Sequence, residues 1–146
     1  MSLDHFQRLE NLFHSAPIQD MLSGAQMKVG KGKSVYTLNI KPAYFHAAEA
    51  MHGAIYFKLL DDAAYFAAAS LELDFFLLTK SYTIQFIRPV QVDALTAKGK
   101  IVKVDGQSFV AKSEIVNSKG KVVAHGEGVF VRSKKPLLEQ AGYVKL

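Results

Sequence analysis

The sequence contains no cysteine, which excludes a disulfide framework, a thiolate metal site and a cysteine nucleophile. It also has no apolar run close to the roughly 20 residues that a membrane-spanning helix needs, so no membrane partner is expected. The N-terminal stretch, residues 1–17, carries Asp4, Arg8 and Glu10 and lacks the uninterrupted apolar core of a signal peptide. These absences predict a cytoplasmic protein.

Charged residues of one sign do not cluster in any part of the sequence. Lys and Arg number 18 against 13 Asp and Glu, which gives a formal net charge of +5 and suits an anionic partner such as a phosphate-bearing molecule. The basic residues are spread along the chain, without an Arg-rich arm or an aromatic RNA-binding signature. Nucleic acid is therefore not an expected partner.

The length of 146 residues fits one domain, since a single core usually serves about 100 to 200 residues. Apolar residues recur at helical spacing over about residues 3–14, which predicts a short amphipathic helix that ends near Pro17. The tail over about residues 133–146 shows no clear period. We expect it to be either flexible or partly ordered by a neighbour.

The middle of the chain changes from helical to alternating periodicity. Residues 32–41 alternate as a strand, and residues 54–73 are apolar and alanine-rich on nearly every face, which predicts a helix that is buried and closely approached by backbone. Four further strands follow, the last three as an antiparallel meander with an Asp105-Gly106 turn. The four are expected at residues 77–88, 95–104, 108–117 and 121–132. An antiparallel sheet curled around the buried helix satisfies this order.

The start of the buried helix is a candidate site for a polarised oxygen. Free backbone N–H groups and the positive end of the helix dipole gather there. Gly53 is the natural donor because it lets a bulky carbonyl approach its N–H. The alternative is a glycine needed only for the bend from loop to helix.

Two carboxylates, Asp61 and Asp62, lie in the middle of this apolar helix, where burial without partners is costly. Lys58 is four residues before Asp62, so the two can pair on a wetter face. That leaves Asp61 as the candidate for chemistry and Asp62 for solvent or a subunit contact. The alternative for Asp61 is a structural carboxylate that caps a loop or pairs with a base.

Two histidines, His46 and His52, lie near the start of the same helix, and either can orient water or donate a hydrogen bond. With Glu49 and Asp61 they could form a metal site by residue type alone. The histidines lack the spacing of a zincin motif, so no metal is expected.

Three features occur in a recognisable order: His52-Gly53, then Asp61 within LLDDAAYFAA, then Thr79 before the strand SYTIQFIRP. Over most of residues 30–132 they resemble the PaaI-like branch of the hotdog thioesterase superfamily. The resemblance implies an α+β hotdog fold, in which an antiparallel five- or six-stranded sheet wraps a long central helix. It also implies homodimers that often become dimers of dimers, and hydrolysis of acyl-CoA at the dimer interface.

The resemblance also implies roles for individual residues. Asp61 falls where the family has its nucleophile or general base, and Gly53 where a backbone N–H polarises the thioester carbonyl. His52 falls on the family's histidine beside that glycine. Thr79 matches a Ser or Thr that, from the partner subunit, helps position the attacking water.

Three positions depart from the family pattern. His46 stands where the family usually has Asn, and a histidine can also orient water or the carbonyl by hydrogen bonding. Glu49 replaces a common Gly, and Ala54 replaces the second Gly of a His-Gly-Gly motif. If Glu49 lies close to Asp61, like-charge repulsion raises the pKa of Asp61.

The leading hypothesis is therefore an acyl-CoA thioesterase, in which CoA is part of the substrate and no separate cofactor is needed. Phe57 and Tyr65, with Phe66, are expected to line the acyl pocket, although ordinary core packing is the alternative. Arg88 and Arg132, with Lys134 and Lys135, are candidates for binding the CoA phosphates. A non-catalytic acyl-CoA-binding or regulatory protein is the second hypothesis, and a hotdog dehydratase the third.

Overall fold

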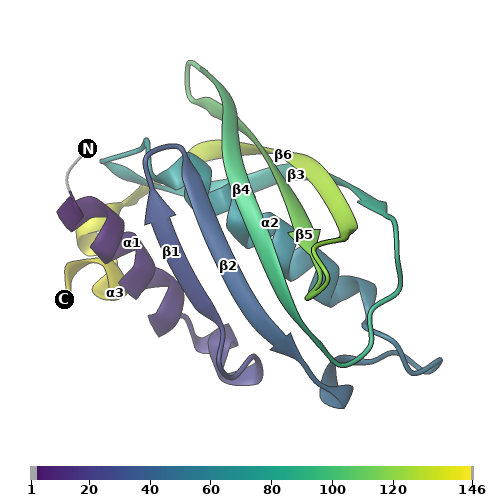
Figure 1. Cartoon of the computed structure of the whole chain (residues 1–146). Coiled ribbons are helices and arrows are strands. Elements are labelled where there is room, and N and C mark those ends of the chain that lie inside the picture. The colour runs from purple at the N-terminus through teal and green to yellow at the C-terminus, as the bar shows by residue number, and fades with distance from the viewer. Residues whose placement is uncertain (1–2, 146) are drawn as a thin grey trace.

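The computed structural model describes residues 3–145 and shows a curled antiparallel sheet around one long helix (Figure 1). The six strands lie in the order β1-β2-β4-β5-β6-β3, so the predicted α+β arrangement is confirmed with six strands. The elements in chain order are α1 (Leu3–Ser15), η1 (Pro17–Met21), β1 (Gln26–Gly30), β2 (Lys33–Ile40), η2 (Pro42–Tyr44), α2 (Gly53–Ala69), β3 (Phe75–Phe86), β4 (Asp93–Asp105), β5 (Ser108–Val116), β6 (Val122–Pro136), η3 (Leu137–Glu139) and α3 (Ala141–Val144).

The strands agree with the alternation in the sequence, with one omission. The alternate residues of β2 are buried as expected, and β4, β5 and β6 form the predicted meander. The short strand β1 was not predicted. It pairs with β2 across a turn in which Gly32 has a φ of 70°. The strand has only five residues and glycines flank it, so its alternation of apolar and polar residues is too short to recognise.

The helix α2 ends at Ala69, four residues earlier than the predicted end at residue 73. The Ser70 hydroxyl donates to Ala67 O and accepts from the Gly32 N–H, which ties the helix end to the β1–β2 turn. Beyond it, the buried Glu72 carboxylate accepts from the backbone amides of Asp74 and Phe75. These amides therefore bond to a side chain instead of continuing the helix.

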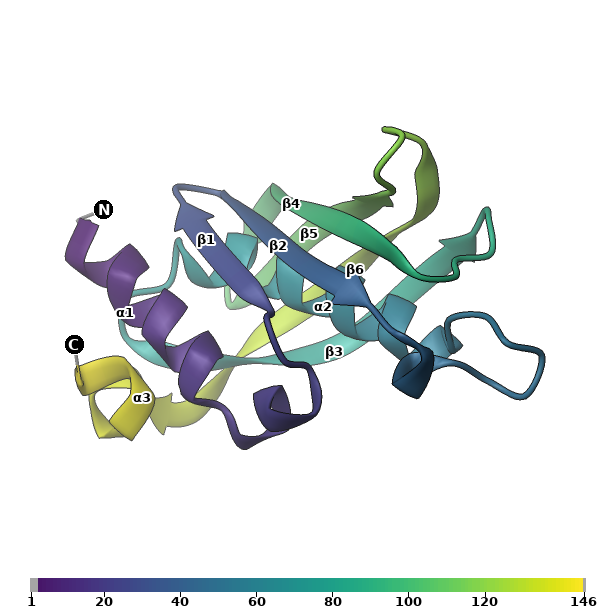
Figure 2. The ribbon, with the colours of Figure 1, turned by 60° about the horizontal axis from the view of Figure 1, so that its bottom comes forward.

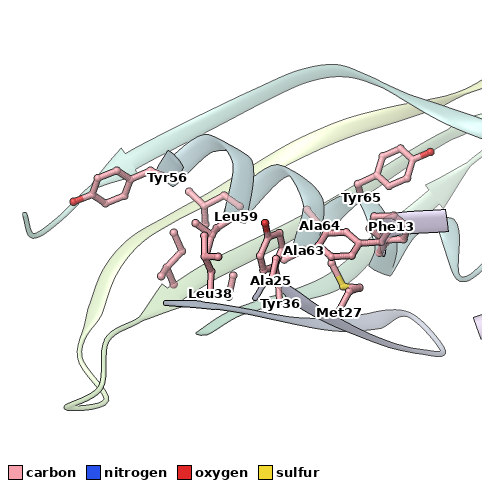
Figure 3. Packing of buried hydrophobic residues seen from close by; sticks show 14 of the residues in the cluster. Phe13, Ala25, Met27, Tyr36, Leu38, Tyr56, Leu59, Ala63, Ala64 and Tyr65 are labelled. Carbon is pink, nitrogen blue, oxygen red and sulfur yellow. The ribbon is translucent and has the colours of Figure 1, made fainter. Parts of the chain in front are cut away.

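The inner face of the sheet touches the backbone of α2 directly. Residues 63–69 of α2 are all buried, and part of this packing is seen in Figure 3. The Ser34 hydroxyl donates to Ala63 O at 2.5 Å, and the Ser113 hydroxyl donates to Leu60 O at 2.7 Å. A Cβ at Gly99 would lie 1.9 Å from Ala63 O. The predicted close approach of backbone to this helix is thus confirmed.

The two ends of the chain pack against each other. In both views α1 and α3 lie side by side at one end of the molecule (Figures 1 and 2). The Asn11 side-chain amide donates to Gly142 O, and the Arg8 guanidinium donates to Tyr143 O at 3.1 Å. The segment after Arg132 completes β6 and then forms η3 and α3, while Leu146 lies outside the described residues.

No helix among residues 3–145 combines the length and apolar character that crossing a membrane requires.

We predict that Gly99→Ala destabilises the protein, because its Cβ would occupy the space of Ala63 O. Overpacking of this kind costs about 1–3 kcal/mol, measured as the free energy of unfolding in urea. Gly53→Ala is the matched control, since its Cβ would meet Phe86 at an ordinary 3.7 Å. Equal loss of stability in both variants would contradict the close contact at Gly99.

Candidate active site

The carboxylate of Asp61 and the hydroxyl of Thr79 form one group of candidate reactive side chains. Asp61 lies on α2 and Thr79 on β3, and Thr79 Oγ1 donates to Asp61 Oδ1 at 2.9 Å. Burial raises the pKa of Asp61 to about 6, with Asp62 adding to the rise, while Thr79 and Lys58 act in the opposite direction. This pKa is closer to the operating pH than that of an ordinary aspartate, which is the direction that favours a general base.

Thr79 reaches Asp61 because β3 contains a bulge. Thr79 pairs with Phe130, but the next register partner, Val129, pairs with Ser81. Lys80 is thus an extra residue, and such a residue reverses the alternation of the strand. Thr79 therefore faces α2 from the same side as Tyr82, although simple alternation assigns it to the other face.

The neighbouring carboxylate, Asp62, forms an ion pair with Lys58. This confirms the predicted pairing, but the expected wetter face is wrong, because both side chains are only 16% exposed. The reason is the position of α1: the Lys58 ammonium lies 5.4 Å from the ring centre of Phe13 and 5.9 Å from that of Tyr36. Asp62 is therefore neutralised under α1 and does not face open solvent.

Gly53 begins a second group of candidate residues. His52 is the N-cap of α2, and its Nδ1 accepts from the Ala54 N–H at 2.9 Å. The Gly53 N–H belongs to the first turn, where the helix offers no carbonyl partner. Gly53, His46 and Arg88 line one hollow of about 360 Å³. A Cβ at Gly53 would meet only ordinary contacts within the chain, so the fold itself does not require glycine there.

The loop before α2 explains one departure from the family pattern. Glu49 has a φ of 65°, a left-handed conformation that glycine adopts most readily. His46 Nδ1 accepts from the Ala48 N–H at 3.0 Å. The groups that shift the pKa of Asp61 are Thr79, Asp62 and Lys58, so the expected effect of Glu49 on Asp61 is absent within one chain. No cluster of metal-ligating side chains is present among residues 3–145.

The two groups do not meet within one chain. Gly53 and Asp61 are eight residues apart on one helix, which is about 12 Å along its axis. A thioester carbonyl that accepts from one and is attacked beside the other needs both within about 3 Å of the reacting atoms. Within one chain Thr79 therefore bonds to Asp61, whereas the Gly53 N–H lies too far along α2 to reach the same carbonyl.

The predicted substrate-binding residues separate in the same way. Tyr65 lines a cavity of about 500 Å³ beside Asp61 and Thr79, whereas Arg88 lies with Gly53. Phe57 lines neither space and is 41% exposed. Arg132 forms an ion pair with the buried Glu72, which neutralises its charge. Sequence reasoning missed that α1, η1 and α3 also line the cavity beside Asp61, because this lining requires both ends of the chain to fold back on α2.

Comparison with known proteins agrees with this geometry. A family model described as the Thioesterase superfamily matches residues 48–124, more than half of the chain. The chain belongs to this superfamily. The match covers Gly53, Asp61 and Thr79, and membership supports hydrolysis of a thioester.

Solved structures extend the likeness to the PaaI-like hotdog thioesterases. The PaaI protein of E. coli, from the phenylacetic acid degradation operon, is 25% identical, with a TM-score of 0.80 over 91% of this chain and 96% of that one. Zebrafish thioesterase superfamily member 2 is 16% identical, with a TM-score of 0.79 over 90% and 100%. A hypothetical thioesterase of Streptococcus pneumoniae with coenzyme A is 21% identical, with a TM-score of 0.72 over 77% and 91%. The comparison with curated proteins found no match.

We predict that Thr79→Val raises the pKa of Asp61 above about 6. The hydrogen bond from Thr79 stabilises the ionised carboxylate, and the substitution removes it. Carbon NMR of the Asp61 carboxyl measures this pKa, and Thr83→Val, on the exposed side of β3, is the matched control.

Since the folded-state pKa of Asp61 already exceeds the ordinary 3.8, ionising Asp61 lowers the free energy of unfolding as pH rises from 3.8 to about 6. In Thr79→Val this loss continues to higher pH. An unchanged pKa would contradict the hydrogen bond.

Proposed function

We propose that this protein is an acyl-CoA thioesterase whose active site forms between two copies of the chain. The observation that carries the proposal is Asp61, a partly buried carboxylate held by Thr79 on the wall of a cavity large enough for an acyl group. Superfamily membership supports the thioester as substrate. The relative solved with coenzyme A supports CoA as its thiol portion.

The proposed reaction uses the two groups of residues in complementary roles. The Gly53 N–H, at the positive end of the α2 dipole, polarises the carbonyl oxygen and stabilises its negative charge. Asp61 either takes a proton from water as the water attacks, or attacks the carbonyl carbon itself and is released by water. In either case the C–S bond breaks and the CoA sulfur leaves with a proton. Both routes require Asp61 to be ionised.

The loop before α2 supplies the remaining polar groups of the proposed site. His52 fixes the first turn of α2 by accepting from Ala54 N–H, which holds the Gly53 N–H in position. His46 engages only its Nδ1 in the hydrogen bond from Ala48, so its Nε2 is the atom that aligns water or the carbonyl. In this proposal His46 replaces the family's Asn.

The edge strand β3 is the proposed contact between the two copies. It is the last strand of the sheet, so its outer backbone groups have no neighbouring strand. Leu78, Phe86 and Ile87, on or beside this strand, are exposed apolar residues. A two-fold contact is self-complementary, so a pairing that brings Gly53 of one copy to Asp61 of the other also forms the reciprocal site. Association of such dimers in pairs stays a prediction.

The CoA phosphates need cations near the Gly53 group. Arg88 lines the same hollow as Gly53, although its guanidinium also donates to Val122 O. Lys134 and Lys135 are exposed and remain candidates. Arg132 is the weakest of the four, because Glu72 already neutralises it.

The first test is release of free thiol from a panel of acyl-CoAs by the wild type and Asp61→Asn. We expect the substitution to abolish turnover while the fold persists, and kcat/KM of the wild type to fall as pH drops below about 6, where Asp61 gains a proton. Asp105→Asn, at the exposed end of β4, is the matched control. Full activity of Asp61→Asn would refute the proposal, and binding without turnover by the wild type would favour the non-catalytic acyl-CoA-binding protein.

The second test concerns the shared site and uses Gly53→Pro. Proline fits the first position of a helix and removes only the N–H, and His52 already has the extended backbone (ψ 143°) that precedes proline. We expect a loss of about 10²–10³ in kcat. Gly53→Ala keeps the N–H and adds only the Cβ, so it should lose less activity than Gly53→Pro.

Gly53→Pro and Asp61→Asn chains are then refolded together. Random two-fold pairing leaves one intact site in each mixed dimer, so about a quarter of the wild-type activity returns. If mixing restores nothing, the site lies within one chain.

A further inference from the structure

The cavity beside Asp61 is formed by two kinds of chain segment. Asp61, Thr79 and Tyr65 belong to the part from α2 and β3, which lies inside the superfamily match at residues 48–124. The rest comes from the end of α1, from η1 and from α3, all of which lie outside that match. These outer residues include Leu12, Phe13, Ala16, Ile18, Ala141 and Gly142.

The cavity suits an apolar group. Phe66 packs edge-on against Phe13 with ring centres 5.7 Å apart, and against Tyr65 at 5.0 Å. The charged Lys58 and Asp62 at the lining neutralise each other. A space of about 500 Å³ lies within the usual range for bound small molecules, and an acetyl group would leave most of it empty.

The hydrogen bonds that hold the terminal part of the lining involve neither Asp61 nor Thr79. Asn11 and Arg8 hold α3 through its carbonyl oxygens. Gly142 allows this contact, because a Cβ there would lie 2.1 Å from Ser15 Oγ and 3.3 Å from the Leu12 Cα. The terminal segments can therefore change in shape while the reacting groups stay in place.

We propose that the α1–η1 and α3 segments determine the length of the acyl group that this protein accepts, and that it favours apolar acyl groups of several carbons over acetyl. The inference rests on the proposed function for the reaction itself. The terminal segments act as specificity-determining walls of the cavity, whereas the superfamily core supplies the chemistry.

The test uses Ala141→Phe, which adds bulk to the cavity from a residue that is otherwise exposed. Ala94→Phe is the matched control, because Ala94 is exposed on β4 and outside the cavity lining. The readout is kcat/KM for straight-chain acyl-CoAs from acetyl to dodecanoyl, and we expect the wild-type value to be lowest for acetyl-CoA. We expect Ala141→Phe to lower kcat/KM about tenfold for the longer acyl groups, as when one or two methylene groups are excluded, and to leave propionyl-CoA unchanged.

A second variant moves the wall instead of filling the cavity. Gly142→Ala displaces α3 from Ser15, so the dependence of kcat/KM on acyl length should change. Adding Ser15→Ala removes the main clash and should restore the wild-type dependence. A length profile that is unchanged in both Ala141→Phe and Gly142→Ala, or changed equally in Ala94→Phe, would overturn the inference.

Binding separates this inference from the proposed function. Calorimetry with S-alkyl-CoA thioethers, which cannot be hydrolysed, measures the dependence of affinity on alkyl length in the same variants. If the wild type hydrolyses no acyl-CoA but Ala141→Phe weakens long thioethers selectively, the proposed function fails and the terminal wall stands. If hydrolysis occurs but Ala141→Phe changes the length dependence of neither kcat/KM nor affinity, the role of the terminal segments is refuted and the thioesterase function stands. Absence of both hydrolysis and thioether binding would overturn both.

Discussion

The contact between the backbone of α2 and the sheet is the constraint on which the rest of the structure depends. Gly99 leaves no room for a Cβ against Ala63 O, and the hydroxyls of Ser34 and Ser113 bond to helix carbonyls. Small side chains at this seam let the sheet close tightly around the helix, as close-packed interiors require. These contacts set the distance of α2 from the sheet and its rotation about its own axis, and so they set the positions of Gly53 and Asp61.

The same close packing produces the electrostatics of the site. Alanines in the second half of α2 are buried, and the carboxylates beside them are only partly exposed. Burial raises the pKa of both Asp61 and Asp62, but the two have different partners. Lys58 compensates the charge of Asp62, whereas Asp61 has the neutral hydroxyl of Thr79. A neutral partner leaves Asp61 able to exchange a proton, which an ion pair would oppose.

The fold was predictable where one periodicity persists over many residues, as in α2 and the strands β2 to β6. The short β1 was missed because glycines flank its few alternating residues. Candidate residues near a motif, such as Gly53 and Asp61, were identified from the sequence together with the family resemblance. Their environment was not, because it depends on contacts between distant segments. No local signal in the sequence indicates that α1 covers Lys58. The same holds for the bulge at Lys80, which turns Thr79 toward Asp61.

The stiffness of α2 has a consequence for how such a site is adjusted. Gly53 and Asp61 lie on one continuous helix, so no loop motion inside a subunit alters the distance between them. In the proposed dimer, the alignment of donor and carboxylate is set by the docking angle of two rigid bodies. Substitutions along the exposed side of β3 can then retune the reaction geometry without altering any reacting group. In such a dimer, catalytic precision would be a property of the quaternary structure.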